Sequence, residues 1–216
     1  GYRGAVVAFD WPSQGVVTAY DPDRHMAEKV AGYLVPEGIR PILQTVANAR
    51  VHLLGHSMGA YLSLLALAAE GETAGETPWK VDEALFVAAD VEASSLRHGA
   101  WGALVMEHRA RRLTNYYNVA DKVLSLSGSF VNFGAPRAGQ VGLPNAEPAN
   151  AVDVYTTEQF RRHVPQNKQN DLIFSHIWLY DDAGFQRDMA LTVMGTADAQ
   201  MPTRVDTNVG DRALLT

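Results

Sequence analysis

Residues 51–67 read Val51-His52-Leu53-Leu54-Gly55-His56-Ser57-Met58-Gly59-Ala60-Tyr61-Leu62-Ser63-Leu64-Leu65-Ala66-Leu67. The short apolar run before Ser57 predicts a buried strand, and the longer apolar run after it predicts a helix. A strand, a serine turn and a helix form a nucleophile elbow, in which the chain reverses sharply and holds the hydroxyl clear of the sheet. Glycines at 55 and 59 avoid side chains that would collide as strand and helix approach. This stretch therefore predicts an α/β fold with a serine nucleophile.

The rest of the chain alternates apolar runs with stretches of helical periodicity. The expected strands are 5–9, 51–54, 84–89, 114–118 and, as the last one, 151–155. The expected helices are 24–48, in two pieces separated by Pro36 and Pro41, the helix after Ser57, 101–113 and 185–194. This alternation predicts a mostly parallel sheet with helices on both faces. We expect a single domain over 1–197 and a polar C-terminal tail over 198–216 that is poorly ordered or lies on the surface.

Three polar segments interrupt this pattern. Residues 70–80 predict a surface loop. Residues 127–150, rich in Gly, Pro and Asn, are longer than an ordinary connection, and such loops are usually functional or flexible. Residues 158–175 carry charges and amides with few apolar anchors, which predicts a mobile flap beside the site.

Composition limits the classes of partner. The chain has 216 residues and a net charge of −6, and its one dense basic cluster, Arg109, Arg111 and Arg112, is expected to be the solvated last turn of a helix. We therefore expect no nucleic-acid partner. No apolar run reaches the roughly 18 residues of a membrane span. The absence of cysteine excludes disulfides and a thiol nucleophile and is compatible with any compartment. A serine nucleophile requires no cofactor and no metal, and the expected partner is a small-molecule ester.

Ser57 needs a histidine base, which in this kind of fold follows the serine on a loop after a later strand. Five of the seven histidines are excluded because they precede Ser57, lie within the elbow or come too early: His25, His52, His56, His98 and His108. His176 lies where a polar loop gives way to apolar residues ahead of the last helix, so it is favoured. His163 lies in a charged segment and is the alternative base.

Two aspartates compete to orient the base, since each closes a predicted strand at the same edge of the sheet. Asp121 follows the later strand, the usual place for the acid, although it could also be a helix N-cap. Asp90 closes the preceding strand and is the alternative acid. The backbone N–H of Met58, at the start of the helix after the elbow, is the expected oxyanion donor.

Several motifs follow one another in a recognisable order. They are Phe9-Asp10-Trp11-Pro12-Ser13-Gln14-Gly15, Tyr20-Asp21, the elbow, Asn118-Val119-Ala120-Asp121-Lys122, Arg137-Ala138-Gly139 and Ser175-His176. In this order the chain resembles bacterial α/β-hydrolases of the esterase/lipase superfamily that were long catalogued as a domain of unknown function. The resemblance implies an α/β-hydrolase fold, a triad of Ser57, Asp121 and His176, and hydrolysis of carboxylic esters. Two alternatives keep the same fold: a non-catalytic binding module and an acyltransferase with the same triad.

The chain departs from this group at its beginning. Members have a His-Gly segment upstream of the Trp-Pro-Ser motif that supplies a second oxyanion N–H, and no such segment precedes Ala5. We therefore expect the N-terminal strands of the fold to be absent from this chain. Trp11 and Tyr20 are expected near the mouth of the pocket, with plain core packing as the alternative, and His56 is a further possible pocket residue that is expected to point away from Ser57.

Overall fold

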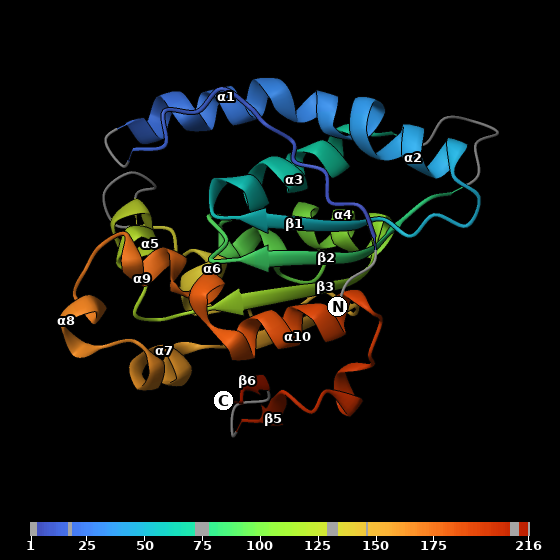
Figure 1. Ribbon diagram of the computed structural model, residues 1–216. Helices are drawn as coiled ribbons and strands as arrows, with labels where there is room; N and C mark the ends of the chain where they lie inside the picture. The colour runs from blue at the N-terminus through green and yellow to red at the C-terminus, as the bar shows by residue number, and fades with distance from the viewer. Residues whose placement is uncertain are drawn as a thin grey trace.

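The computed structural model describes residues 4–16, 19–71, 78–128, 134–145, 147–207 and 212–215. Within these residues a six-stranded sheet has the order β1-β2-β3-β4-β6-β5 (Figure 1). The strands are β1 (His52–His56), β2 (Val81–Val87), β3 (Ala110–Tyr117), β4 (Ala151–Tyr155), β5 (Arg204–Asp206) and β6 (Arg212–Leu214). Every neighbouring pair is parallel except β5 and β6. The mostly parallel sheet confirms the predicted fold class.

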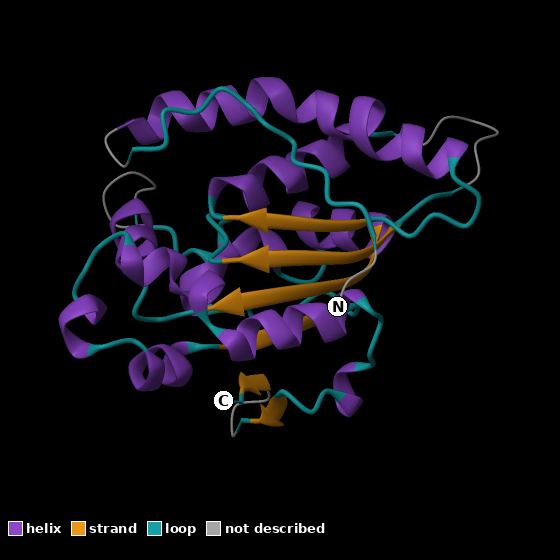
Figure 2. Ribbon diagram, viewed as in Figure 1, coloured by secondary structure: helices purple, strands orange, loops and turns teal. Residues whose placement is uncertain are grey.

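Helices surround this sheet (Figure 2). They are α1 (Tyr20–Tyr33), η2 (Leu34–Ile39), α2 (Arg40–Thr45), α3 (Met58–Ala69), η3 (Ala93–Leu96), α4 (Trp101–Arg109), α5 (Lys122–Leu126), α6 (Ala138–Val141), α7 (Thr157–His163), α8 (Gln166–Gln169), α9 (Phe174–Ile177), η5 (Trp178–Asp181), α10 (Ala183–Val193) and η6 (Asp198–Gln200).

Two hydrophobic cores lie on opposite faces of the sheet, because successive side chains of a strand point to opposite faces. In β2, Phe86 belongs to the core formed with α1, α3 and α4, whereas Leu85 and Val87 belong to the core formed with α7, η5 and α10. All three side chains are buried. A strand covered on both faces must be apolar throughout, which explains the continuous apolar run that the sequence shows here.

The elbow has the expected strand-turn-helix geometry. Ser57 stands between the end of β1 and the start of α3 with φ 54° and ψ −122°, a strained conformation for a residue with a side chain. A Cβ at Gly55 would lie 2.6 Å from Ala60 Cα, so close approach of β1 and α3 requires glycine there. A Cβ at Gly59 would meet no atom within 4 Å. The expectation that both glycines prevent a collision therefore holds for Gly55 and is wrong for Gly59.

We expect Gly55→Ala to lower the free energy of unfolding by about 1–3 kcal/mol, because backbone of α3 would have to move away from the new methyl group. Gly59→Ala is the matched control: it adds the same methyl group to open space in a helix, so it should leave stability unchanged or raise it by up to about 1 kcal/mol. Equilibrium urea denaturation measures both. Equal losses in the two variants would show that crowding does not select glycine at position 55.

The strand predicted at 5–9 does not form. Its residues have no regular secondary structure and pair with no described strand, and Val6 and Val7 are 87% and 74% exposed. The described sheet ends at β1, and an apolar segment becomes a strand only when a neighbour accepts its backbone hydrogen bonds.

The stretch predicted as two helical pieces, broken or kinked at Pro36 and Pro41, is an unbroken run of helical backbone in which the π-helical turn η2 separates α1 from α2. Helical backbone begins at Tyr20 and runs through α1, η2 and α2 to Thr45. Pro36 lies in η2, a wider π-helical turn, which accommodates a residue without an N–H donor. Pro41 lies in the first turn of α2, directly after η2, where the backbone changes from π-helical to α-helical.

The helix predicted over 101–113 ends four residues early, because residues 110–113 pair with β2 as part of β3. Arg109 is buried, lies over the Trp79 ring and donates to the backbone oxygen of Glu70. Arg112 donates to the Glu83 carboxylate at 2.7 Å. The basic cluster is therefore not a solvated helical turn, and only Arg111 is exposed.

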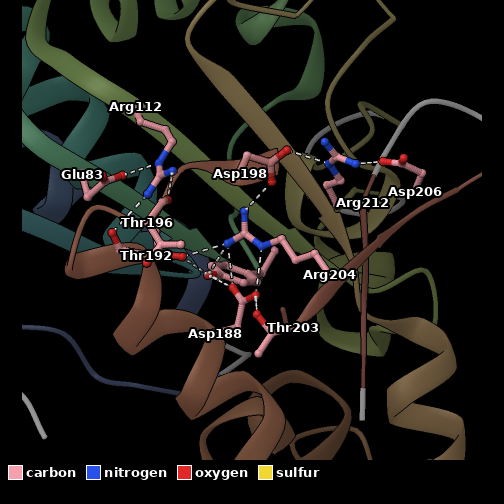
Figure 3. Close-up of polar contacts among 11 residues, drawn as sticks. Glu83, Arg112, Asp188, Thr192, Thr196, Asp198, Thr203, Arg204, Asp206 and Arg212 are labelled. Atoms are coloured by element: carbon pink, nitrogen blue, oxygen red, sulfur yellow. Dashed lines mark hydrogen bonds and ion pairs between the residues drawn. The ribbon is translucent and has the colours of Figure 1, made fainter. Parts of the chain in front are cut away.

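The segment predicted as a polar tail contributes two strands. β6 pairs parallel with β4, and β5 pairs antiparallel with β6, so β4 is not the last strand of the sheet. Arg204 of β5 is buried against Asp188 of α10 (Figure 3). Of the described charges of this segment, Asp198, Arg204 and Arg212 lie in buried or partly buried ion pairs, whereas Asp206 is exposed. These pairs are why its polar composition was misleading.

The segment predicted as a flap, 158–175, folds largely into helices α7, α8 and the start of α9. Phe160 and Val164 are buried in the second core, so the expectation of few apolar anchors was wrong. The long loop over 127–150 contains the short helix α6. Residues 129–133 and 146 of that loop, and residues 72–77 of the loop predicted at 70–80, lie outside the described residues.

Candidate active site

Backbone hydrogen bonds hold Ser57 at the carboxyl end of the sheet. Its N–H donates to Val87 O at 3.0 Å, and its carbonyl oxygen accepts from Asp90 N at 3.1 Å. Met58 is the first residue of α3, where an N–H has no intrahelical acceptor and the positive end of the helix dipole lies. The serine and a backbone donor with no acceptor in its own helix therefore stand next to each other.

Asp121 and His176 are hydrogen-bonded to each other. Asp121 Oδ2 lies 2.7 Å from His176 Nδ1, and the two residues are 1% and 7% exposed. The other carboxylate oxygen, Oδ1, accepts from Leu124 N at 3.0 Å and caps α5. A carboxylate accepts hydrogen bonds, so the proton of the imidazole lies on Nδ1 and Nε2 keeps a lone pair. Asp121 thus caps α5 with one carboxylate oxygen and binds the His176 imidazole with the other, so both predicted roles apply to it.

Ser175 anchors α9 to the loop that carries Asp121. Its hydroxyl accepts from Lys122 N at 3.1 Å and donates to Leu172 O at 2.7 Å. Asn118 Nδ2 donates to Ser175 O at 3.5 Å. The residues that flank Asp121 and His176 are therefore bound to each other by hydrogen bonds between side chains and the main chain.

His56 contacts His176 directly. Its Nε2 lies 3.1 Å from His176 O, and the two ring centroids are 4.6 Å apart. Burial, and then the nearby His176 ring, lower the pKa of His56 to about 4. An unfolded histidine titrates near 6.5, so the unfolded chain binds more protons and the folded state loses stability as pH falls from about 6.5 toward 4. His56 was expected to be a possible pocket residue that points away from Ser57, and its contact with His176 was not predicted from the sequence.

No hydrogen bond within the described residues joins Ser57 Oγ to the His176 ring. The main chain of His176 nevertheless contacts the residue that precedes the nucleophile, because His56 donates to the His176 carbonyl oxygen. Hydrogen bonds between a nucleophile and its base are often long in uncomplexed sites and shorten when substrate binds.

The two alternative residues have other partners. Asp90 Oδ1 accepts from Ser127 Oγ at 2.9 Å and lies 3.4 Å from Arg137 Nε. His163 Nδ1 lies 2.6 Å from Asp182 Oδ2, at the start of α10. The structure thus pairs Asp121 with His176, places His176 against His56 next to Ser57, and places Asp90 and His163 in separate ion pairs.

The Arg-Ala-Gly motif packs against the main chain just after β2, at the same edge of the sheet. Gly139 packs on the backbone of Ala88 and Ala89, where a Cβ would overlap with main-chain atoms. Its N–H donates to Ala89 O at 3.0 Å, and its own oxygen accepts from Asn118 N at 3.0 Å. The motif therefore connects the end of β2 to the residues just ahead of Asp121.

Trp11 packs against the first core, and Tyr20 is the first residue of α1. A place for either residue at the pocket mouth stays a prediction. Within the described ranges, no three side chains that could ligate a metal converge. Among the described helices, none combines the length and apolar character needed to cross a membrane.

The sequence of this chain matches a known protein family. No curated protein and no solved structure matches the chain. The family described as alpha/beta hydrolase of unknown function (DUF900) matches residues 1–172, a range that contains Ser57 and Asp121 and ends before His176. This match confirms the resemblance to α/β-hydrolases and agrees with the mostly parallel sheet. The chain therefore belongs to the DUF900 family of alpha/beta hydrolases.

Proposed function

We propose that this protein is a serine hydrolase that cleaves carboxylic esters through an acyl-enzyme. The observation that supports this proposal best is the buried hydrogen bond between Asp121 and His176 beside the elbow of Ser57. Removing a carboxylate from water is unfavourable by several kcal/mol, so a buried Asp–His pair is not expected on a surface that only binds a partner. An imidazole held in one tautomer is, in contrast, what a serine nucleophile requires.

In the acylation step, His176 Nε2 accepts the proton of Ser57 Oγ as the oxygen forms a bond to the ester carbonyl carbon. The negative charge that develops on the carbonyl oxygen is stabilised by the N–H of Met58, and Asp121 stabilises the imidazolium. The tetrahedral intermediate then collapses, the bond to the alcohol oxygen breaks, and His176 gives its proton to that oxygen. The products are the free alcohol and an ester of Ser57.

In the deacylation step, a water molecule gives a proton to His176 Nε2 and attacks the acyl carbon. The second tetrahedral intermediate collapses, the bond to Ser57 Oγ breaks, and the proton returns to that oxygen. The acid leaves and the enzyme regains its starting state. Removing one oxyanion donor typically raises the barrier by about 2.7–4 kcal/mol, so the Met58 N–H is a substantial part of the proposed site.

A fluorophosphonate probe tests the proposal, because it reacts with a serine that an adjacent base activates. We expect stoichiometric labelling of the folded protein and, after proteolysis, mass spectrometry that assigns the adduct to the peptide containing Ser57. A panel of 4-nitrophenyl esters of increasing acyl length should be turned over by the same preparation. A folded protein that takes no label and hydrolyses none of these esters would instead be a binding module, and a label on another serine would exclude Ser57.

A further inference from the structure

The proposed mechanism leaves one contact of the site without a role, the hydrogen bond from His56 to the main chain of His176. The two atoms, His56 Nε2 and His176 O, are 3.1 Å apart. A carbonyl oxygen can only accept, so the proton of the His56 ring lies on Nε2 and its Nδ1 is unprotonated. The contact therefore fixes the tautomer of His56 as well as its orientation.

Aromatic neighbours hold the His56 ring in this orientation. The centroids of the His56 and His176 rings are 4.6 Å apart, and the two ring planes make an angle of 50°. The centroids of the His56 and Tyr180 rings are 5.4 Å apart in an edge-to-face arrangement with an angle of 73° between the planes. Tyr180 in turn packs edge-on against Phe185 of α10 at 5.9 Å. Burial raises the pKa of Tyr180 to about 12, so this neighbour is uncharged at neutral pH. The ring is thus enclosed between the elbow, α9 and η5.

His176 is consequently held at two points by residues outside its own helix. Asp121 binds the side chain through Nδ1, and His56 binds the main chain through the carbonyl oxygen. These partners lie 55 and 120 residues away in the sequence, and His56 is the residue that precedes the nucleophile. The hydrogen bond from His56 therefore links the main chain of His176 directly to the residue next to Ser57.

We propose, on the basis of the proposed function, that His56 is a positioning residue that holds the His176 imidazole at a reactive distance from Ser57. The effect of losing such a contact can be large, because a displacement of about 1 Å between reacting groups lowers a rate by about 100-fold.

The charge state of His56 suits this role. Its pKa lies near 4, lowered by burial and then by the charge of His176, with Asp121 acting in the opposite direction. Its ring is therefore neutral when His176 becomes an imidazolium in the reaction, and no like charge opposes that step. The charged and titratable groups around it are His176, Asp121 and Tyr180.

Two substitutions separate the hydrogen bond from the shape of the ring. His56→Phe keeps an aromatic ring against Tyr180 and removes the donor, whereas His56→Gln retains an N–H donor at a similar reach. We expect the phenylalanine variant to lower kcat and the rate of fluorophosphonate labelling by about 10- to 100-fold, with KM changed by less than about threefold. The glutamine variant should recover most of this loss. His52→Phe, on the same strand and away from His176, is the matched control and should leave the rates unchanged.

Either of two outcomes in folded variants would overturn the proposal: labelling of His56→Phe at the parent rate, or equal losses in the phenylalanine and glutamine variants. Nitrogen NMR of the unmodified protein provides a test that needs neither folding of a variant nor activity. We expect His56 to remain the neutral Nε2–H tautomer from pH 8 down to about pH 5. Titration near pH 6.5, or a proton on Nδ1, would contradict the hydrogen bond itself. Unmodified protein that takes no label while His56 shows the expected tautomer would instead contradict the proposed function.

Discussion

Asp121→Asn is expected to lower kcat for ester hydrolysis by about 10⁴-fold while the protein stays folded. The asparagine oxygen can still accept from Leu124 N, so the cap of α5 is kept. Its amide group, however, can donate to His176 Nδ1, which moves the imidazole proton to Nε2. That tautomer cannot accept the proton of Ser57, so the base is lost although every atom is near its original place. Steady-state hydrolysis of a 4-nitrophenyl ester measures the effect, with Ser57→Ala as the background rate.

Asp90→Asn is the matched control for this prediction, since it neutralises the other aspartate at the same edge of the sheet. Asp90 is paired with Arg137 and Ser127 rather than with an imidazole. We expect its activity per folded molecule to stay within about threefold of the parent protein, although its stability should fall because Arg137 is buried. A large loss of activity in folded Asp90→Asn, together with parent-like activity of Asp121→Asn, would reverse the assignment of the acid.

The sequence predicts best what is local. The elbow is a contiguous stretch whose strand, turn and helix follow from apolar runs and from Gly55, and the structure has each of them. Chain order at the carboxyl edge of a parallel sheet favoured Asp121 and His176, with Asp90 and His163 as alternatives, and the structure pairs Asp121 with His176. The contact of His56 with His176 does not follow, because it depends on how a loop 120 residues later packs onto the elbow.

The sequence predictions that were wrong also concern features that depend on contacts between distant parts of the chain. Residues 5–9 have strand-like composition, but a strand needs a neighbour, and none pairs with them in the described sheet. Strands β5 and β6 are three residues long each, too short to show a period of two. Their arginines and aspartates are typical of a solvated tail by composition, and only the fold shows that these charges meet one another.

An inner group of polar side chains joins the C-terminal strands to the body of the protein (Figure 3). Arg204 donates to both oxygens of Asp188, from Nη2 at 2.6 Å and from Nε at 2.9 Å. The same carboxylate accepts from Tyr116 at 2.7 Å and from Thr203 at 2.6 Å. The side chains of Arg204 and Asp188 are 1% and 0% exposed, so water cannot replace a missing partner.

A second, more exposed group of charged side chains, formed by Asp198, Arg212 and Asp206, continues these contacts toward the protein surface. Asp198 lies 3.0 Å from Arg204 Nη1 and 2.6 Å from Arg212 Nε, and Arg212 also contacts the exposed Asp206. The two groups together connect η6, β5 and β6 to α10. Because α10 also carries Phe185, which packs on Tyr180 beside His56, the C-terminal strands support the helix against which the candidate site is built.

Asp188→Ala is expected to lower the free energy of unfolding by about 3–5 kcal/mol, because it leaves the Arg204 guanidinium buried without its carboxylate. The double variant Asp188→Leu with Arg204→Met should recover most of this loss, since replacing both charges with apolar side chains removes the unpaired ion. Asp206→Ala, which removes a carboxylate that is 83% exposed, is the control and should change stability by no more than about 0.5 kcal/mol. Equilibrium urea denaturation gives all three values. A loss below about 1 kcal/mol in Asp188→Ala would mean that the ion pair does not stabilise the packing of the C-terminal strands on α10. A double variant no more stable than Asp188→Ala would mean that the polar contacts themselves stabilise this part of the fold, rather than the absence of an unpaired charge.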